Sequence, residues 1–233
     1  ESTIRACIES VKAQDYPLIE VIAVDDGSTD DTLNIITGIT GVRVLSQNNN
    51  GAPAARNLGA SFANGEYLKF IDADDVLLQG SIANQVEISQ RLSEHEISYG
   101  DYVEVTNGGE RYVSTKIPYR DQIVGLHFTD ILISTPLNRP SSIAAIGGFD
   151  TRLVRGQEWD LHIRLAAFGV RFVHDNCPVF KYSNYSVVGR ISMQSAKRTA
   201  SQRLEIDLAR ELAVAEFISQ INRNRYLILK WYR

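Results

Sequence analysis

Stretches with helical hydrophobic spacing alternate with short apolar runs over the first third of the chain. Ile4, Ile8 and Val11 recur at helical spacing and predict a helix that Pro17 stops. Residues 19–24 form a β-branched, apolar run, which predicts a strand. The predicted order is therefore a helix and then a strand, whereas parallel-sheet domains normally open with a strand.

Two more helix–strand units follow. Leu33 and Ile36 predict the inward face of a second helix, and residues 42–45 predict a second strand. A third helix is expected over about 53–63, since proline suits the first helical turn, and residues 67–71 are expected to form a third strand. Nearly all-apolar strands that alternate with helices are typical of a parallel sheet covered on both faces. The sequence therefore predicts an α/β fold with a mostly parallel central sheet flanked by helices.

The pattern changes in the second half of the chain. Residues 97–105 and 112–115, on either side of an Asn-Gly-Gly turn, predict a small antiparallel pair. A short helical stretch is expected near residues 126–133. The remaining expected elements are a helix, two short strands and a helical tail, over residues 157–168, 171–174, 179–182 and from about 195 onward.

Composition places the chain among ordinary globular proteins. It has 233 residues, 44% of them hydrophobic and 22% charged, so it can bury a sizeable core. No apolar run approaches the roughly 20 residues that span a bilayer, and no charged-then-apolar leader opens the chain. Cys7 and Cys177 are far apart and form no CxxC pair, so we expect buried thiols in a reducing compartment and a cytoplasmic protein.

Charge is distributed unevenly along the chain. A formal net charge of −4 argues against a nucleic-acid binder, because neutralising phosphates requires a surplus of clustered Lys and Arg. Residues 190–233 nevertheless carry nine Lys or Arg against four Asp or Glu, a net +5 that leaves −9 on residues 1–189. A solvated helix face explains such a tail most simply. Its mixture of cationic, aromatic and aliphatic groups also suits peripheral contact with an anionic membrane, or self-association.

Acidic residues follow two of the predicted strands. Asp25 and Asp26 come directly after the first strand, and Asp72 and Asp74 come directly after the third. The carboxyl ends of parallel strands meet at one edge of a sheet, where ligands bind. Two aspartates that flank one residue suit Mg²⁺ or Mn²⁺, although turns are also rich in aspartate for structural reasons. Arg56, on an intervening segment, adds a cation to this edge, which we interpret as a candidate binding site.

These motifs resemble those of family 2 glycosyltransferases over roughly residues 4–185. The stretches that carry the likeness occur in order, at residues 24–30, 50–57, 65–75, 147–150 and 156–169. The resemblance implies the GT-A fold and transfer of a sugar from a nucleotide-diphosphate donor, by the family's habit a UDP-sugar, to an acceptor hydroxyl. It implies inversion at the anomeric carbon and a place in polysaccharide or glycoconjugate biosynthesis.

The resemblance also implies roles on the donor side. Asp25, with Asp26 beside it, would hydrogen-bond the base, since a carboxylate accepts well from a uracil N3–H; turn and helix capping is the alternative for Asp26. Arg56 would lie near the nucleotide or diphosphate, with a helix-surface salt bridge as its alternative. Asp72 would bind ribose or support the metal, and Asp74 would ligate a Mn²⁺ or Mg²⁺ ion that bridges the diphosphate.

On the acceptor side, Glu158 occupies the position of the family's general base. The alternative for Glu158 is a charge that complements the helix macrodipole, and Asp160 could replace it as the base. Trp159 is either a platform for the acceptor sugar or a core residue. The acceptor would be a carbohydrate or a lipid-linked glycan.

The domain prediction is one GT-A unit over residues 1–189, followed by a basic helical extension over 190–233. The donor-binding half would cover about 1–100 and the acceptor half about 101–189. The family's first strand, with its Pro-x-Tyr-Asn turn, is absent before Glu1. Two alternatives remain at this point. One is a GT-A-like nucleotidyltransferase, which would usually begin with a glycine-rich basic loop that this sequence lacks, and the other is a non-catalytic nucleotide-sugar-binding domain.

Overall fold

The computed structural model describes residues 2–117, 121–129 and 131–183. The helices are α1 (Ile4–Lys12), α2 (Thr32–Thr37), α3 (Ala52–Phe62), α4 (Ser81–Ser89), α5 (Gln122–Phe128), α6 (Pro140–Ala145) and α7 (Gln157–Phe168). The strands are β1 (Val21–Asp25), β2 (Val42–Ser46), β3 (Val76–Leu77), β4 (Glu96–Thr106), β5 (Gly109–Val113), β6 (Pro136–Leu137) and β7 (Arg171–Ser183). The predictions for the basic tail, residues 190–233, lie outside the described residues. None of the described helices is long and apolar enough to cross a membrane.

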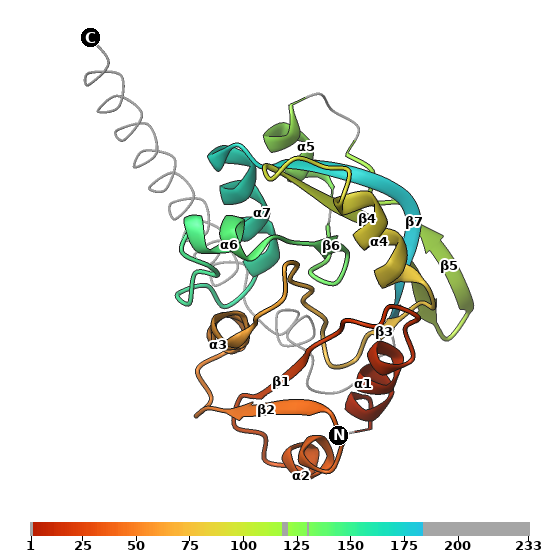
Figure 1. The fold of residues 1–233 in the computed structure, drawn as a ribbon, viewed down its shortest axis with the longest axis vertical. Coiled ribbons are helices and arrows are strands. Elements are labelled where there is room, and N and C mark those ends of the chain that lie inside the picture. Colours follow the sequence, from red (N-terminus) through yellow and green to blue (C-terminus); the bar gives the residue numbers. More distant parts are fainter. Residues whose placement is uncertain (1, 118–120, 130, 184–233) are drawn as a thin grey trace.

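The strands form two sheets (Figure 1). β1 and β2 pair in parallel, with Asp25 opposite Ser46 at their carboxyl ends. The larger sheet has the order β3-β7-β4-β5, and β6 pairs with β4. Its longest ladder joins β4 to β7 in parallel, whereas β3, β5 and β6 are attached antiparallel. The prediction of a mostly parallel α/β fold with a small antiparallel portion is confirmed.

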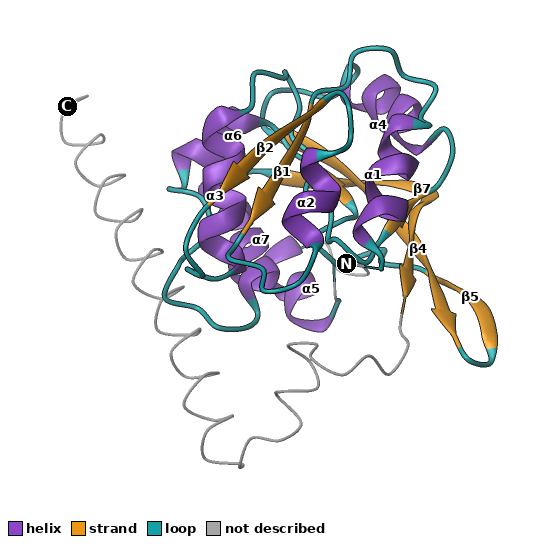
Figure 2. Ribbon diagram, turned by 90° about the horizontal axis from the view of Figure 1, so that it is seen from below, coloured by secondary structure: helices purple, strands orange, loops and turns teal. Residues whose placement is uncertain are grey.

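Helices pack against both sheets, whereas β5 is largely exposed. α3 packs against β1, and α2 packs against β1, β2 and α1. In the larger sheet, α4 packs against β4, β6 and β7, and α7 packs against β7 and α5. Figure 2 shows the small sheet with α3 and α2 beside it and the β4–β5 hairpin projecting at the far side of the molecule. The carboxyl end of β1 and the start of α3 therefore lie in one part of the fold.

Residues 67–71 form no ladder, so the prediction of a third parallel strand is wrong. Leu68 and Asn138 exchange two backbone hydrogen bonds, of 2.8 and 2.9 Å, in an isolated antiparallel bridge. Phe70 is 7% exposed and belongs to the main core cluster. The apolar run reflects burial of the segment, which periodicity cannot distinguish from strand pairing. The segment still delivers the chain to an acidic turn at residues 72–75, as the sequence indicated.

The second half of the chain follows its predictions with local differences. α7 has the predicted bounds, and β4 and β5 form the predicted antiparallel pair. α5 ends at Phe128, so the helix expected near 126–133 begins and ends earlier. β7 is one strand where two were predicted, and Asn176 adopts a left-handed φ of 57° between the two runs. Cys7 is buried as expected, but Cys177, beside this irregularity, is exposed.

Candidate active site

Asp25, at the end of β1, uses only one of its two carboxylate oxygens in hydrogen bonds to described residues. Its side chain is 4% exposed, and Oδ2 accepts 3.3 Å hydrogen bonds from the backbone N–H groups of Gly27 and Ser28. Oδ1 is also buried, and it has no hydrogen-bond partner among the described residues. Buried polar oxygens are normally paired, so this atom is suited to accept a hydrogen bond from a ligand.

Asp26 anchors the loop that leads into α3. Its Oδ1 accepts from the Gln47 side-chain amide at 2.7 Å and from the backbone N–H of Asn50 at 2.8 Å. Its Oδ2 accepts from the backbone N–H of Gly51 at 2.8 Å, and Gly51 has a left-handed φ of 89° at the start of α3. Asp26 thus fixes the loop geometry, and Asp25 beside it keeps a free acceptor.

Arg56 joins two parts of the site that are far apart in the sequence. Its Nη2 donates to Asp72 Oδ1 at 2.7 Å, and its Nη1 donates to Gln157 Oε1 at 2.8 Å. The guanidinium also lies over the Phe149 ring, 5.4 Å from the centroid. Because the planar guanidinium presents donors in fixed directions, it sets the position of the acidic turn relative to the first residue of α7.

Hydrogen bonds with Ser134 hold the second acidic turn, residues 72–75, in place. Ser134 Oγ accepts from the backbone N–H of Asp72 at 3.3 Å and donates to Asp75 Oδ2 at 2.7 Å. Asp75 is buried, whereas the side chain of Asp72 is 45% exposed and Asp74 is half-buried. Burial, aided by the charges of Asp75, Asp72 and Asp74, raises the pKa of the neighbouring Cys7 thiol to about 12. The Cys7 thiol is therefore protonated at pH 7 in the unliganded fold.

The donor set fits a cation that arrives with its substrate. Mg²⁺ is commonly held by one or two carboxylates together with waters and substrate phosphates. Asp72 and Asp74 supply two such carboxylates. Within residues 2–117, 121–129 and 131–183, no group of three or more His, Cys, Asp or Glu side chains could hold a metal ion alone. The remaining ligands of a cation at this turn could be waters and diphosphate oxygens.

Glu158 opens onto a cavity of about 270 Å³. Gly156, in a left-handed conformation with φ of 66°, precedes α7, and Glu158 and Trp159 lie half-buried in its first turn. The cavity lies between α5, the following loop and α7, and is lined by Leu126, Thr129, Ile131, Leu132, Gly156, Glu158, Trp159 and His162. The predicted base and the predicted aromatic platform therefore share one cavity.

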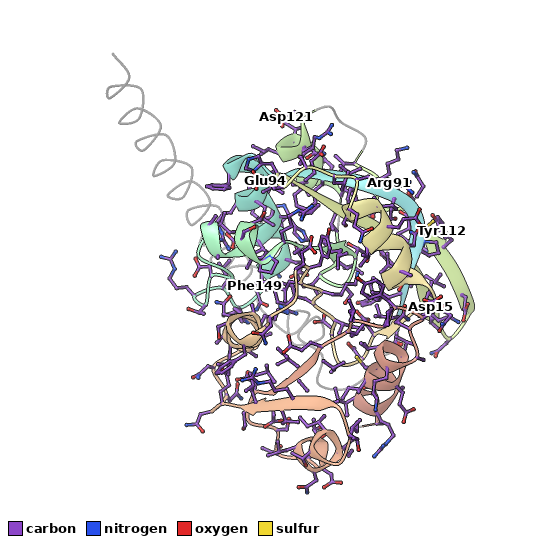
Figure 3. The ribbon with its side chains drawn as sticks, viewed as in Figure 1. Asp15, Arg91, Glu94, Tyr112, Asp121 and Phe149 are labelled. Atoms are coloured by element: carbon purple, nitrogen blue, oxygen red, sulfur yellow. The ribbon has the colours of Figure 1, made fainter. Side chains whose placement is uncertain are left out.

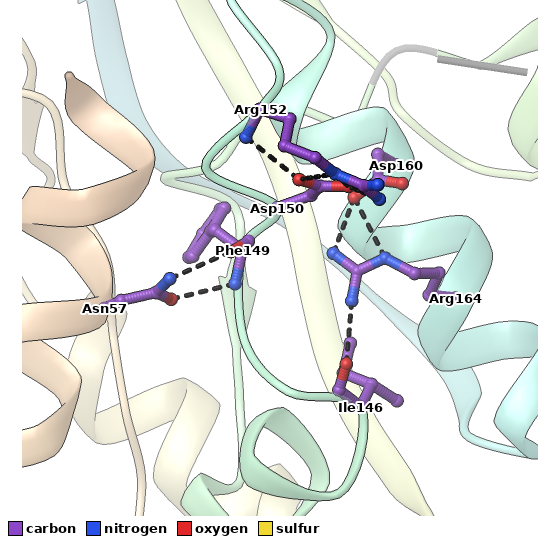
Figure 4. Close-up of polar contacts among 7 residues, drawn as sticks. All are labelled: Asn57, Ile146, Phe149, Asp150, Arg152, Asp160 and Arg164. Carbon is purple, nitrogen blue, oxygen red and sulfur yellow. Dashed lines mark hydrogen bonds and ion pairs between the residues drawn. The ribbon is translucent and has the colours of Figure 1, made fainter. Parts of the chain in front are cut away.

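Asp160 lies away from this cavity and forms a buried ion pair with Arg164 (Figure 4). Its side chain is fully buried, and Oδ2 accepts from Arg164 Nη2 and Nε at 2.5 and 2.9 Å. Arg164 also donates to the carbonyl of Ile146 at 3.0 Å. Burial raises the pKa of Asp160, although the Arg164 charge acts in the opposite direction. Asp160 does not line the cavity that Glu158 opens onto.

A pair of hydrogen bonds between Asn57 and Phe149 forms a clamp that connects α3 to the segment before α7. Asn57 Nδ2 donates to the carbonyl of Phe149, and the Phe149 N–H donates to Asn57 Oδ1, both at 2.8 Å (Figure 4). Phe149 itself lies in the interior (Figure 3). Gly148 has a φ of 74°, and a Cβ there would lie 2.5 Å from Asn57 Oδ1. The clamp therefore requires glycine at position 148.

Several residues of this site escaped the sequence analysis. Gln157 and Ser134 are ordinary polar residues whose partners come from distant segments, and nothing in their local sequence signals those contacts. Lys69 carried a signal, because it interrupts an apolar run. Its Nζ donates to Gln85 Oε1 at 2.7 Å and to the Thr135 carbonyl at 3.2 Å, which holds the segment that carries Ser134.

The Lys69 ammonium predicts a pH dependence of stability. Burial lowers its pKa from 10.5 to about 7, against the opposing charges of Asp175 and Asp75. The unfolded chain therefore binds more protons than the folded chain between these pH values, and the free energy of unfolding should rise with pH across that window. Relative to Lys69→Met, we expect the wild-type free energy of unfolding to rise between about pH 7 and pH 10 in urea titrations. Parallel curves over the whole range would contradict the assignment.

The chain is similar in sequence to known proteins. The family model described as Glycosyl transferase family 2 matches residues 1–142. The UDP-Glc:alpha-D-GlcNAc-diphosphoundecaprenol beta-1,3-glucosyltransferase WfaP of Escherichia coli is 39% identical over 105 residues, 44% of this chain and 41% of that protein. Glycosyltransferase GlyG of Streptococcus pneumoniae is 38% identical over 101 residues, 41% of this chain and 33% of that protein. The chain thus spans less than half the length of these relatives.

Solved structures share the fold. The crystal structure of S. aureus TarS 1–349 in complex with UDP-GlcNAc superposes with a TM-score of 0.70 at 20% identity, over 94% of this chain and 68% of that chain. The complex of the same protein with UDP gives a TM-score of 0.64 at 22% identity, over 78% and 56% of the two chains. At this level of identity the likeness establishes the fold.

Proposed function

The chain belongs to glycosyl transferase family 2, and on that premise we propose that it transfers a sugar from a UDP-sugar to a hydroxyl of a carbohydrate or lipid-linked glycan, with inversion. Uridine is supported by the UDP-Glc in the name of the WfaP relative and by the UDP and UDP-GlcNAc complexes of TarS. A lipid-linked acceptor is supported by the diphosphoundecaprenol in the same relative's name.

The contact of Arg56 with both Asp72 and Gln157 is the observation that carries this proposal. Displacement at a sugar carbon needs a leaving-group side and a base side that are held at a fixed separation. The acidic turn supplies the first, and Glu158, next to Gln157, supplies the second. One guanidinium thus bridges the two halves of the proposed reaction.

On the donor side, the buried Asp25 Oδ1 would accept the N3–H of the uracil base. Asp26 would keep the adjoining loop in place, and Arg56 would add positive charge near the diphosphate. Asp72 and Asp74 would hold Mn²⁺ or Mg²⁺ together with diphosphate oxygens. Such a cation supplies charge neutralisation to the departing diphosphate.

On the acceptor side, Glu158 would take the proton from the attacking hydroxyl. For inversion the base must act on the face of the sugar opposite the leaving group, so it cannot be one of the carboxylates of the acidic turn. Glu158 borders the cavity, whereas Asp160 is fully buried and engaged by Arg164, and this difference favours Glu158. Trp159 would offer its aromatic face to the acceptor ring.

A donor screen tests the function directly. We expect the protein to release UDP from one of UDP-Glc, UDP-GlcNAc and UDP-Gal in the presence of Mn²⁺ and a glycan acceptor, with GDP-mannose and a dTDP-sugar as comparison donors. Release of pyrophosphate from UTP and a sugar phosphate would indicate a nucleotidyltransferase instead. UDP binding without turnover on any donor would indicate a binding domain.

Arg56→Lys tests the bridge between the two halves. A lysine keeps the charge but lacks the planar fork whose two separate nitrogens reach Gln157 and Asp72, so we expect one charge-assisted hydrogen bond to be lost. We expect kcat/KM to fall about 10-fold or more, as the loss of such a bond implies. The fall should appear mainly in kcat, and steady-state kinetics at saturating donor measures it. Unchanged kcat would show that the bridge does not set the reacting geometry.

A further inference from the structure

An unpaired polar atom lies in the wall of the cavity beside Glu158. His162 is 1% exposed, and its Nε2 is buried with no hydrogen-bond partner in the described part of the chain. Its ring packs edge-on against Phe172, with the centroids 5.4 Å apart. Burial lowers the pKa of His162 to about 3, so the imidazole is neutral at pH 7. A buried polar atom without a partner is rare in native proteins and calls for an explanation.

The helix directs His162 toward the same space as the proposed base. Glu158 and His162 are four residues apart, so they lie on one face of α7, ~6 Å apart along the axis. Both line the cavity. Glu158 is only half-buried, whereas His162 is almost sealed. The carboxylate therefore lies toward the opening of the cavity and the imidazole at its floor.

The chemistry of the walls limits what the cavity can hold. The other described residues of the wall are the aliphatic Leu126, Ile131 and Leu132, together with Trp159, Gly156 and Thr129, so the lining is mostly apolar and carries one hydroxyl group. No Lys or Arg is among the described residues that line it. A phosphate or carboxylate would meet a neutral imidazole and the Glu158 carboxylate, and no described residue of the wall supplies a cation to stabilise it. A sugar ring without charge has the apolar C–H face and the hydroxyl groups that these walls match.

We propose that this cavity is the subsite for a neutral acceptor sugar and that His162 Nε2 selects it by hydrogen-bonding a hydroxyl that does not react. The inference rests on the proposed function, because Glu158 must face the reacting hydroxyl of the same ring. An imidazole nitrogen can donate or accept according to its tautomer, so His162 Nε2 can pair with a hydroxyl group that acts as acceptor or as donor. The contact would exclude an acceptor that lacks this hydroxyl more strongly than the apolar walls could.

Binding can be tested without turnover by NMR of protein labelled at histidine. The probes are the methyl glycosides of glucose, galactose, N-acetylglucosamine and glucuronic acid, each added in the presence of UDP and Mg²⁺, which is diamagnetic and leaves the histidine signals sharp. We expect at least one neutral glycoside to shift the His162 ring signal saturably, and the glucuronide to leave it in place. If UDP binds and no neutral glycoside shifts the signal, or if the glucuronide binds as tightly, the inference is overturned. If UDP itself does not bind, the proposed function fails with it.

A pair of variants isolates the Nε2 contact. His162→Phe keeps a ring against Phe172 but removes the nitrogen, and it should weaken the best glycoside about 10–100-fold with the Kd for UDP unchanged. In His162→Gln the amide nitrogen can stand near the position of Nε2, so most of the affinity should return. Wild-type affinity in His162→Phe would overturn the assignment. Equal losses in both variants, with UDP binding intact, would reduce His162 to a packing role and overturn it as well.

Discussion

Replacing Glu158 with glutamine is expected to lower kcat by about 10²–10⁴-fold while the Kd for the donor barely changes. A positioned general base contributes an effect of this size, and glutamine is nearly isosteric but cannot accept the proton. Glu158 borders the cavity at the start of α7 and lies apart from the donor-side carboxylates in the sequence, so the substitution leaves the nucleotide contacts in place. Paired measurements of kcat and of donor Kd by calorimetry test both halves of the statement.

Two further variants serve as controls for Glu158→Gln. Glu94→Gln makes the same chemical change at an exposed position on the outside of the molecule (Figure 3), and it should leave kcat unchanged. Asp160→Asn should act differently, because it weakens a buried ion pair with Arg164 and therefore costs stability. If Asp160→Asn alone loses turnover at normal donor affinity, the base is Asp160. If neither Glu158→Gln nor Asp160→Asn loses turnover, proton abstraction by either carboxylate is ruled out.

Replacing Asp74 with alanine should remove most of the metal-dependent part of nucleotide binding and of turnover. A bound cation contributes several kcal/mol to stabilising the departing diphosphate, so turnover in Mn²⁺ should fall about 10²-fold or more. For the wild type, we expect the Kd for UDP to be tighter with Mn²⁺ than with EDTA. For Asp74→Ala the two values should converge, which calorimetry in the two buffers measures.

The matching control is Asp15→Ala, at an exposed aspartate on the periphery (Figure 3). It should retain the full effect of Mn²⁺ on both binding and turnover. Persistence of wild-type metal dependence in Asp74→Ala would exclude Asp74 as a ligand. A fall in turnover that is the same with and without Mn²⁺ would instead indicate that the substitution deforms the turn.

The features that the sequence predicted well are those set by local chemistry. α7 could be bounded from its amphipathic pattern and the glycines on either side, and α3 from the proline in its first turn. The acidic turns could be placed because each follows an apolar run, whether or not that run pairs as a strand. The sequence did not predict that residues 67–71 stay out of a ladder. This outcome depends on the bridge between Leu68 and Asn138, and no local pattern encodes that partner.

The contacts within the site could not be predicted for the same reason. Arg56 and Gln157 are 101 positions apart, and Asn57 and Phe149 are 92 apart. Asp25 and Asp26 look equivalent in the sequence, yet one carboxylate is fully engaged in the loop and the other retains an unpaired oxygen. Which of two adjacent acids keeps an unpaired oxygen is thus decided by the direction of each side chain at the end of β1.

The clamp between Asn57 and the Gly148–Phe149 backbone has a practical consequence for redesigning acceptor choice. A side chain at position 148 would need both a left-handed backbone and space that Asn57 occupies, so this position offers nothing to a mutant library. The aliphatic residues at 126, 131 and 132 make no side-chain hydrogen bond that must be kept, but Leu126 and Ile131 belong to the main core cluster and Leu132 packs against the other core cluster. Directed evolution should therefore vary these three wall positions among apolar side chains of different volume and leave the clamp untouched.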